Sequence, residues 1–531
     1  QDIVLGRMPD WNPAEIIGAK PNALSKSLYE YLIMNDVWAK QRFEYGYKDL
    51  RKNKLMQSLH HHVFVDVRAS FNSFIPHKLS KKFTKKLMNY YLNKLKQNPE
   101  NHDKVEFEIL FTCFDFDIKK RLKDLEVSEE FSSNEIDEIY EALFEITQKQ
   151  FPRSSEHLSK LKMLEKKRLN ILNSDSGIVD KLKSLLNDAK EYGTLPFAHL
   201  ARNGFVATSL LKSLNRLGVL SEDDIGSFYK SLNTITFQME VDSYKLSKNE
   251  TSKEDYIKKY GHLRPGTYEI LIPSYKNNFD GYLSHLTNDS SNTKPMLHKF
   301  SWTEDQIINI QEILDRTFKW TFEEFDLYLR EAISGRELAK LEFTKNLSIA
   351  LDFIQSWGKQ YLSLDAPDLT HLRINEILKD ESIAKKKENF KKLISNEKEN
   401  KQIASFIEFP DLIFKEKDLD YHFRDSGKPN FVTNQNIISN IVVLESKDLF
   451  NKELQDSIIL IEQADPGYDW LFSKNIGGLI TKYGGANSHM TIRCSELGIP
   501  AAIGVGDLIY ENLKNVKNIS LDCQNQKIEI L

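Results

Sequence analysis

The sequence has very little cysteine: Cys113, Cys494 and Cys523 are the only three among 531 residues. They are too few and too scattered for a disulfide framework or a zinc site, which favours a reducing compartment. No run of residues approaches the roughly 20 apolar positions of a transmembrane helix, and the N-terminus has no charged-then-apolar signal pattern. The sequence therefore predicts a cytoplasmic protein that has no membrane segment and no metal site of its own.

An excess of charge of one sign is also missing. The chain has 73 Lys and Arg residues against 77 Asp and Glu residues, a formal net charge of −4. Local basic runs such as residues 385–387 alternate with glutamates, which is typical of a solvated helix face. Nucleic acid is therefore not an expected partner.

The length of 531 residues exceeds what one hydrophobic core organises, so roughly three to four domains are expected. Prolines and Gly18 predict an N-terminal segment without a continuous helix over residues 1–20. Residues 21–415 carry long helical periodicities, for example over 322–362, and predict a large, mostly helical domain. Residues 416–531 change to short apolar runs, each followed by a turn, which predicts a strand-rich domain. The expected fold class is a multidomain α+β protein.

The stretch GGANSHMTIRCSELGIPAAIGVGD carries the strongest chemical signal in the chain. Gly484 and Gly485 follow a predicted strand over 476–481, and they let the backbone turn sharply and leave room for a bulky anion. Asn487 and Ser488 are favoured N-cap residues, so a helix is predicted to begin directly after them.

His489 is thus expected at the start of that helix, where free N–H groups and the helix dipole favour an anion. Arg493 lies four residues on, on the same face, and could pair with a phosphate. A neutral imidazole is a good nucleophile near pH 7 and forms a labile N–P bond. The alternative interpretation is that His489 only occupies the start of a helix that ends at Gly498.

The whole stretch resembles the phosphohistidine motif of the swivelling domain in phosphoenolpyruvate synthase, pyruvate phosphate dikinase and rifampicin phosphotransferase. Met490 and Thr491 depart from it, because the family usually has two alanines there. The positions that satisfy the family pattern are Gly484, Gly485, Ser488, His489, Ile492, Arg493, Leu497, Gly498, Ile499, Pro500, Ala501 and Gly504.

The resemblance implies a β/β/α domain that swings between two sites. At one site an ATP-grasp domain phosphorylates His489 from ATP with Mg²⁺, and at the other the phosphohistidine donates to an acceptor. Gly485, Asn487, Ser488 and Arg493 would support the phosphoryl group.

The sequence shows no motif of a nucleotide-binding domain. The sequence contains no Gly-x-x-x-x-Gly-Lys-Ser/Thr phosphate loop and no GxGxxG pattern after a strand. In the resembled family the ATP-grasp domain precedes the region that begins here with Gln1. We therefore expect that domain, which binds most of the ATP and Mg²⁺, to be absent from this chain and to act in cis or in trans.

The segment ADPGYDW, residues 464–470, resembles the stretch that precedes the Gly-Gly strand in these enzymes. Its Asp465 is interpreted as a structural residue, with an alternative role in orienting the swivelling loop.

Acceptor contacts are expected in two irregular segments of the helical region, residues 61–76 and 260–275, because loops and strand ends carry sites while helices support them. In the first, Arg68, Ser70 and Asn72 are expected to alternate onto one side of an extended segment, as an anion-binding guanidinium beside two neutral hydrogen-bonding groups.

The other acceptor candidates are Arg264 and Tyr268 in the second segment, His199 and Arg202 about one turn apart on a helix, and Arg336. A single arginine is more often part of a structural ion pair. Several arginines in Gly/Pro-marked or apolar settings favour at least one substrate contact.

Most of the chain also resembles a subgroup of these enzymes from bacterial cell-surface polysaccharide pathways. That subgroup includes a kinase of capsular phosphoramidate biosynthesis that phosphorylates the amide nitrogen of L-glutamine and produces AMP and phosphate from ATP. L-Glutamine is therefore the expected acceptor. The alternatives are another acceptor, such as pyruvate or an antibiotic hydroxyl, and a non-catalytic phosphocarrier or scaffold protein.

Overall fold

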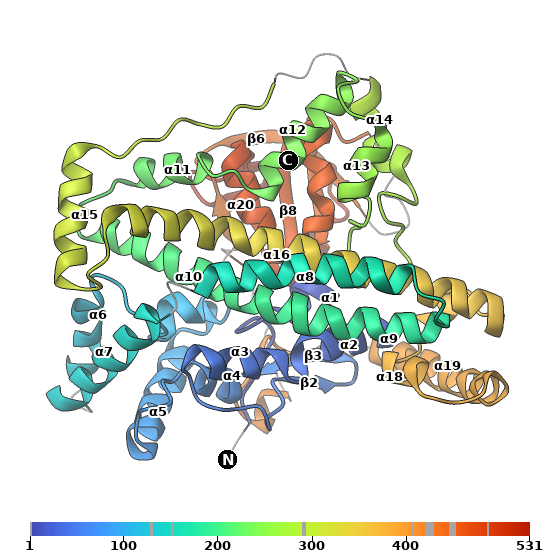
Figure 1. Ribbon diagram of the computed structural model, residues 1–531, viewed down its shortest axis with the longest axis horizontal. Helices are drawn as coiled ribbons and strands as arrows, with labels where there is room; N and C mark the ends of the chain where they lie inside the picture. The colour runs from blue at the N-terminus through green and yellow to red at the C-terminus, as the bar shows by residue number, and fades with distance from the viewer. Residues whose placement is uncertain are drawn as a thin grey trace.

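The computed structural model describes eight stretches of the chain, within which it is mainly helical and contains two β-sheets (Figure 1). The expected multidomain α+β class is confirmed at this level, while the domain boundaries stay predictions. The described residues are 3–127, 131–149, 153–288, 294–405, 407–419, 429–444, 453–485 and 488–531.

A small four-stranded sheet joins distant parts of the chain. Its order is β2-β3-β1-β4, and β1 pairs antiparallel with β3 on one side and β4 on the other. The first strand of the chain is thereby tied to the segment that leads into the C-terminal sheet. The strands are β1 (Leu5–Gly6), β2 (Met56–Leu59), β3 (His62–Asp66) and β4 (Leu412–Ile413).

Helices form the body of the molecule around this sheet. The first group is α1 (Pro13–Ile17), α2 (Ala23–Tyr29), the π-helix η1 (Glu30–Met34), α3 (Val37–Tyr45), α4 (Val67–Ser73), α5 (Lys81–Gln97), η2 (Pro99–Asn101), η3 (Val105–Ile109), α6 (Ile118–Val127), α7 (Ser133–Gln148), α8 (Ser154–Leu172), α9 (Ile178–Ala189), η5 (Lys190–Thr194) and α10 (Leu195–Arg216). The second group is α11 (Glu222–Lys230), α12 (Ile235–Ser247), α13 (Lys253–Tyr260), α14 (Phe279–Asn288), α15 (Glu304–Arg316), α16 (Phe322–Trp357), η6 (Gly358–Leu362), α17 (Ala366–Leu369), α18 (Ile374–Leu378), α19 (Ile383–Ser405) and η7 (Glu416–Leu419).

The helix α16 has 36 residues and starts at a capping box formed by Thr321 and Glu324. At a rise of about 1.5 Å per residue it is roughly 54 Å long. In Figure 1 it crosses the middle of the molecule with α8 and α10 alongside. Its buried side chains enter four hydrophobic clusters, through Leu329, Ala339, Leu341 and Leu347 in turn. One helix therefore connects the cores of the protein.

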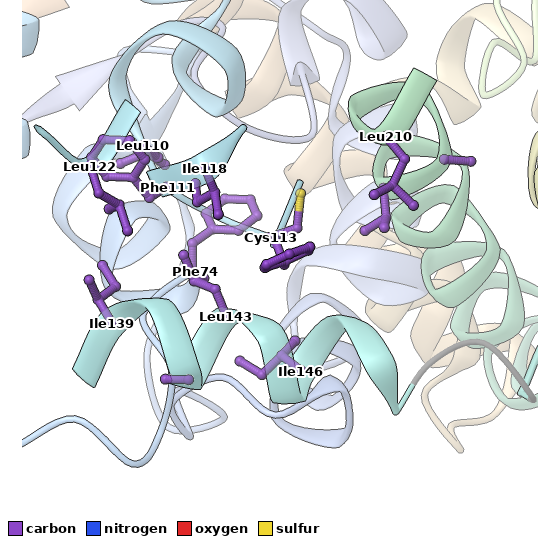
Figure 2. Close-up of a cluster of buried hydrophobic side chains, with 14 of the residues drawn as sticks. Phe74, Leu110, Phe111, Cys113, Ile118, Leu122, Ile139, Leu143, Ile146 and Leu210 are labelled. Carbon is purple, nitrogen blue, oxygen red and sulfur yellow. The ribbon is translucent and has the colours of Figure 1, made fainter. Parts of the chain in front are cut away.

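The largest of these clusters holds the end of the helical body that contains α5, α6 and α7. Figure 2 shows Ile139, Leu143 and Ile146 on one face of α7, directed toward Phe111, with Leu210 of α10 on the far side. Spacing of three and four residues places such side chains on one helix face, so the amphipathic pattern of α7 buries this face and leaves the opposite one polar.

The C-terminal sheet has seven strands in the order β11-β10-β6-β7-β8-β9-β5. Its central strands β6 to β9 are parallel, and the outer pairings are antiparallel. Met490 of α20 packs on one face and Tyr510 of α21 on the other. The elements are β5 (Asn430–Val432), β6 (Asn436–Val443), β7 (Ile458–Gln463), the 3₁₀ segment η8 (Pro466–Lys474), β8 (Gly478–Tyr483), α20 (His489–Leu497), β9 (Ala501–Ile503), α21 (Gly506–Leu513), β10 (Asn518–Asp522) and β11 (Lys527–Ile530).

One expectation about the N-terminal third holds and another is wrong. Residues 3–20 carry no continuous helix, as expected; the short helix α1 begins at Pro13, where the missing N–H of proline costs no hydrogen bond. Arg68 and its neighbours form helix α4 and not an extended segment, because the Asp66 side chain accepts a hydrogen bond from the Ala69 N–H at 3.0 Å and caps the helix.

No helix in the described stretches is long and apolar enough to cross a membrane. The three cysteines are buried free thiols.

Candidate active site

The turn after β8 requires glycine. Gly484 has φ 152°, and a Cβ there would lie 2.7 Å from Ile503 Cγ2 and 2.8 Å from Ala464 Cβ. At Gly485 the space is open, because the nearest atom to a Cβ would be Asn12 Nδ2 at 3.8 Å. The turn thus places a side-chain-free stretch of backbone against the N-terminal segment of the helical body.

His489 is the first residue of α20, as predicted. The Ser488 side chain accepts a hydrogen bond from the Thr491 N–H, and the Thr491 hydroxyl donates to the Gly485 carbonyl at 2.9 Å. Gly498 ends the helix in the left-handed conformation, with φ 68°. The cap therefore fixes the ring of His489 directly beside the glycine turn.

Asp469 of η8 holds the imidazole. The Nε2–H of His489 donates to both carboxylate oxygens, at 2.7 and 2.8 Å. Burial alone would raise the pKa of Asp469, but His489, Arg493 and Lys340 outweigh it and leave this pKa below its ordinary value. Asp469 is thus an ionised partner, and the arrangement is that of the unphosphorylated ring.

Sequence reasoning did not identify Asp469. The segment that contains it was recognised, but attention fell on Asp465, whose carboxylate accepts from the Gly467 N–H at 2.7 Å and the Thr267 hydroxyl at 3.1 Å. The bond from Gly467 caps η8 and the bond from Thr267 ties it to the helical body, which is a structural role.

Arg493 is buried and already engaged. Its guanidinium bonds to Glu240 of α12 at 2.7 Å and to Glu496 at 2.8 Å, and its Nε lies 3.8 Å from Asp469. These carboxylates raise the pKa of Arg493 despite the opposing effect of burial. In this state Arg493 links the C-terminal domain to the helical body, and a phosphoryl group on His489 would have to compete with Glu240 for it.

Three of the acceptor candidates lie on α4 and do not share a face. Ser70 and Arg68 are two residues apart, which in a helix separates side chains by about 200°. Ser70 donates to Asp10 at 3.0 Å, and the Asn72 amide donates to the Arg68 carbonyl at 3.0 Å. The expected row of Arg68, Ser70 and Asn72 along one side is therefore wrong.

His199 and Arg202 on α10 have partners inside the helical body. His199 Nε2 lies 3.0 Å from Glu44, and Arg202 is paired with Glu106. The Arg202 guanidinium also stacks over the Phe205 ring, 4.5 Å from its centroid. The charge of Arg202 lowers the pKa of Asp10, and Ser70 donates a hydrogen bond to the same carboxylate. Arg202 and Ser70 therefore belong to one buried network.

Arg264 and Tyr268 lie in a non-helical segment, as expected. Arg264 is buried and bonds to Ser348 at 2.8 Å and Asp352 at 3.1 Å, so its guanidinium is already paired. Tyr268 is 2% exposed, its hydroxyl has no partner among the described residues, and it lines a cavity of about 290 Å³ together with Tyr468.

Arg336 lies on α16. Its charge lowers the pKa of Glu15 and of Lys340, and the charge of Lys340 in turn lowers the pKa of Asp469. Glu15 and Lys340 were not singled out from sequence, because a helix-borne Glu or Lys looks like any surface charge. Asn487 lies outside the described residues.

Residues 454–526 match a known protein family, described as the mobile domain of PEP-utilising enzymes. Phosphoenolpyruvate synthase of Escherichia coli (strain K12) is similar, with 28% identity over 83 residues. That alignment covers 16% of this chain and 10% of the synthase. The superfamily predicted from the glycine–histidine motif is thereby supported, and the mobile-domain match includes His489, Asp469 and Arg493.

Proposed function

We propose that this chain, whose C-terminal region carries a mobile domain of the PEP-utilising superfamily, is part of a phosphotransferase in which His489 carries the phosphoryl group to a small acceptor. The observation that supports this most directly is the placement of His489 at the capped start of α20, beside a glycine turn. The free N–H groups of that helix turn favour the anion that His489 would carry.

The proposed donor is ATP with Mg²⁺, which would yield AMP and phosphate. The described residues contain no group of three or more His, Cys, Asp or Glu side chains suited to a metal ion. By resemblance to the superfamily, ATP and Mg²⁺ would be bound mainly by an ATP-grasp domain that acts in cis or in trans.

L-Glutamine is the proposed acceptor, in bacterial capsule phosphoramidate biosynthesis and in the cytoplasm. An amide nitrogen is a poor nucleophile because its lone pair is delocalised into the carbonyl, so it needs a reactive donor. A phosphohistidine meets that need, provided that water is excluded from the site. Contact between the mobile domain and the helical body, through Arg493 and Glu240, supports such exclusion.

The first test loads the chain without any nucleotide domain. Incubation with potassium phosphoramidate, followed by mass spectrometry under alkaline conditions, should find phosphate on His489. The variant His489→Asn should lose that phosphate, whereas His298→Asn, at an exposed position of the body, should keep it. Phosphate on other histidines but not on His489 would contradict the proposal.

The second test identifies the acceptor. The loaded chain is mixed separately with L-glutamine, pyruvate and a hydroxyl-bearing antibiotic, and phosphorus NMR follows the products. N-Phosphorylated glutamine is the expected product. Transfer only to pyruvate or to the hydroxyl would replace the acceptor, and a stable phosphohistidine with all three would favour a phosphocarrier.

A further inference from the structure

The guanidinium of Arg493 is bonded to carboxylates from both parts of the molecule. Its Nη1 donates to Glu496, one turn further along α20, at 2.8 Å. Its Nη2 donates to Glu240 of α12, in the helical body, at 2.7 Å. The guanidinium also lies over the Phe472 ring, 5.4 Å from its centroid. Both terminal nitrogens therefore have carboxylate partners while His489 carries no phosphoryl group.

The third nitrogen of Arg493 has no such partner. Its Nε is buried, has no hydrogen-bond partner among the residues that the structure describes, and lies 3.8 Å from Oδ1 of Asp469. That same oxygen accepts the hydrogen bond from His489 Nε2 at 2.7 Å. A phosphoryl group that displaced Asp469 from His489 would thus meet a guanidinium whose other two nitrogens are already bonded.

Glu240 belongs to a helix that is fixed to the body. Thr236 lies four residues before Glu240, on the same face of α12, and its hydroxyl donates to Glu337 of α16 at 3.2 Å. Met239 packs against the cluster that contains Leu341 of α16. Glu240 can therefore bond to Arg493 only while the mobile domain rests on the body.

Resting on the proposed function, we infer that Glu240 is a positioning residue that draws Arg493 away from the phosphohistidine when the mobile domain docks on the body. Away from the body, Nη2 and Nε of Arg493 form a free fork that suits two phosphoryl oxygens. On the body Glu240 occupies Nη2, and its negative charge opposes that of the phosphoryl group. The phosphohistidine is therefore held firmly in transit and loosely on the helical body.

The transfer step exchanges bonds at phosphorus. The nucleophilic atom of the acceptor forms a bond to phosphorus while the N–P bond breaks, and the electron pair of that bond returns to the ring nitrogen of His489. The proton that the acceptor loses passes to this ring. The ring N–H then donates to Asp469, as it does in the unphosphorylated state. The contact between Arg493 and Glu240 belongs to the same state, so it favours discharge.

The experiment measures discharge without relying on the identity of the acceptor. The full chain is loaded with potassium phosphoramidate, and phosphorus NMR follows the decay of the phosphohistidine in hydroxylamine, a small nucleophile. Glu240→Gln keeps the shape of the side chain and removes its charge, and we expect it to slow discharge about tenfold or more. Glu254→Gln, at an exposed position of α13, is the matched control and should discharge like the wild type.

A double-mutant cycle separates this role from a merely structural one. If Glu240 acts through Arg493, Glu240→Gln should change the rate by less than about twofold in an Arg493→Gln background. Glu240→Ala should slow discharge as Glu240→Gln does and provides a second variant if one of them fails to load.

Discharge of Glu240→Gln and Glu240→Ala at the wild-type rate would overturn the inference. So would equal slowing in the presence and in the absence of Arg493. A wild-type chain that takes no phosphate at His489 would refute the proposed function itself, whereas loading without any effect of Glu240 refutes only this inference.

Discussion

Asp469 determines which nitrogen of His489 is available. While its carboxylate accepts the Nε2 proton, the lone pair of a neutral ring resides on Nδ1. Under the proposed function, transfer through Nε2 would require this contact to open, and the contact would re-form once the phosphoryl group had left. Asp469 would then stabilise the unphosphorylated ring and favour discharge.

We expect Asp469→Asn to slow discharge of the phosphohistidine to the acceptor by about 10- to 100-fold. A charge-assisted hydrogen bond contributes about 1.5–3 kcal/mol, and each 1.4 kcal/mol is a factor of ten. Decay of the phosphohistidine signal in phosphorus NMR measures the rate. Asp223→Asn, at an exposed position of α11, is the control, and equal rates in both variants would exclude this role.

Glu15 makes stability depend on pH in an unusual direction. Its pKa is raised from 4.5 to about 7, so the folded protein binds this proton more tightly than the unfolded chain does. The contribution of Glu15 to the free energy of unfolding therefore falls as pH rises from about 4.5 to about 7 and is constant above that. Glu15→Gln should remove this fall and exceed the wild type at pH 8 by up to about 3 kcal/mol. Denaturant titrations at pH 5 and pH 8 measure it, and a difference that is the same at both pH values would contradict it.

At the scale of elements, α20 depends on its two ends. Ser488→Ala should cost about 1 kcal/mol of stability, because it removes the acceptor for the Thr491 N–H. It should also lower the yield of phosphohistidine, since the cap positions His489. Ser495→Ala in the exposed middle of α20 should be neutral or slightly stabilising, because alanine is the better helix former. Thermal unfolding and phosphoramidate loading of the two variants form the comparison.

The ends of α20 were predictable from sequence because their signals are local: a glycine pair, a serine cap and a terminal glycine within 15 residues of one another. The long helix over 322–362 was predictable for the same reason, since its periodicity lies within one stretch. The segment at Arg68 was wrongly predicted to be extended. The alternation of valines in β3 continues in the sequence past Asp66, which caps helix α4 and ends the strand. A capping residue within an alternating pattern competes with that pattern, and here the Asp66 cap ends the strand and starts helix α4.

Acceptor contacts could not be predicted in the same way, because they join residues far apart in the chain. Ser70 meets Asp10, and Arg202 meets Glu106, across separations that no periodicity encodes. Arginine identity suggested binding, yet two of the four candidate arginines, Arg202 and Arg264, are paired inside the body. The unpaired cation Lys340 was overlooked because pairing is a property of the fold.

At the scale of the whole molecule, the mobile domain sits closely on the helical body. A Cβ at Gly467 would lie 1.9 Å from the Arg264 carbonyl oxygen, so backbone meets backbone there. The Tyr275 hydroxyl donates to the Gly467 carbonyl at 3.3 Å across the same contact. Such contact holds only while residue 467 has no side chain.

Gly467→Ala should therefore separate the two parts. We expect a larger radius of gyration in small-angle scattering and loss of acceptor transfer with His489 loading retained. Gly226→Ala is the matched control, because nothing lies within 4 Å of a Cβ there. An unchanged radius and unchanged transfer in Gly467→Ala would show that this contact is not needed for docking.

The length of α16 carries a consequence for the gene. Because one helix enters four hydrophobic clusters and also holds Arg336 and Lys340, each core fixes the rotation of the helix about its axis. A single inserted residue would rotate the rest of the helix by about 100° about its axis. The side chains of one core, or Arg336 and Lys340, would then point in the wrong direction. Substitutions on the exposed side should be tolerated, whereas a codon-insertion library should yield almost no functional clones across the interior of these 36 positions. Related sequences should therefore vary at the exposed positions of α16 and keep its number of residues constant.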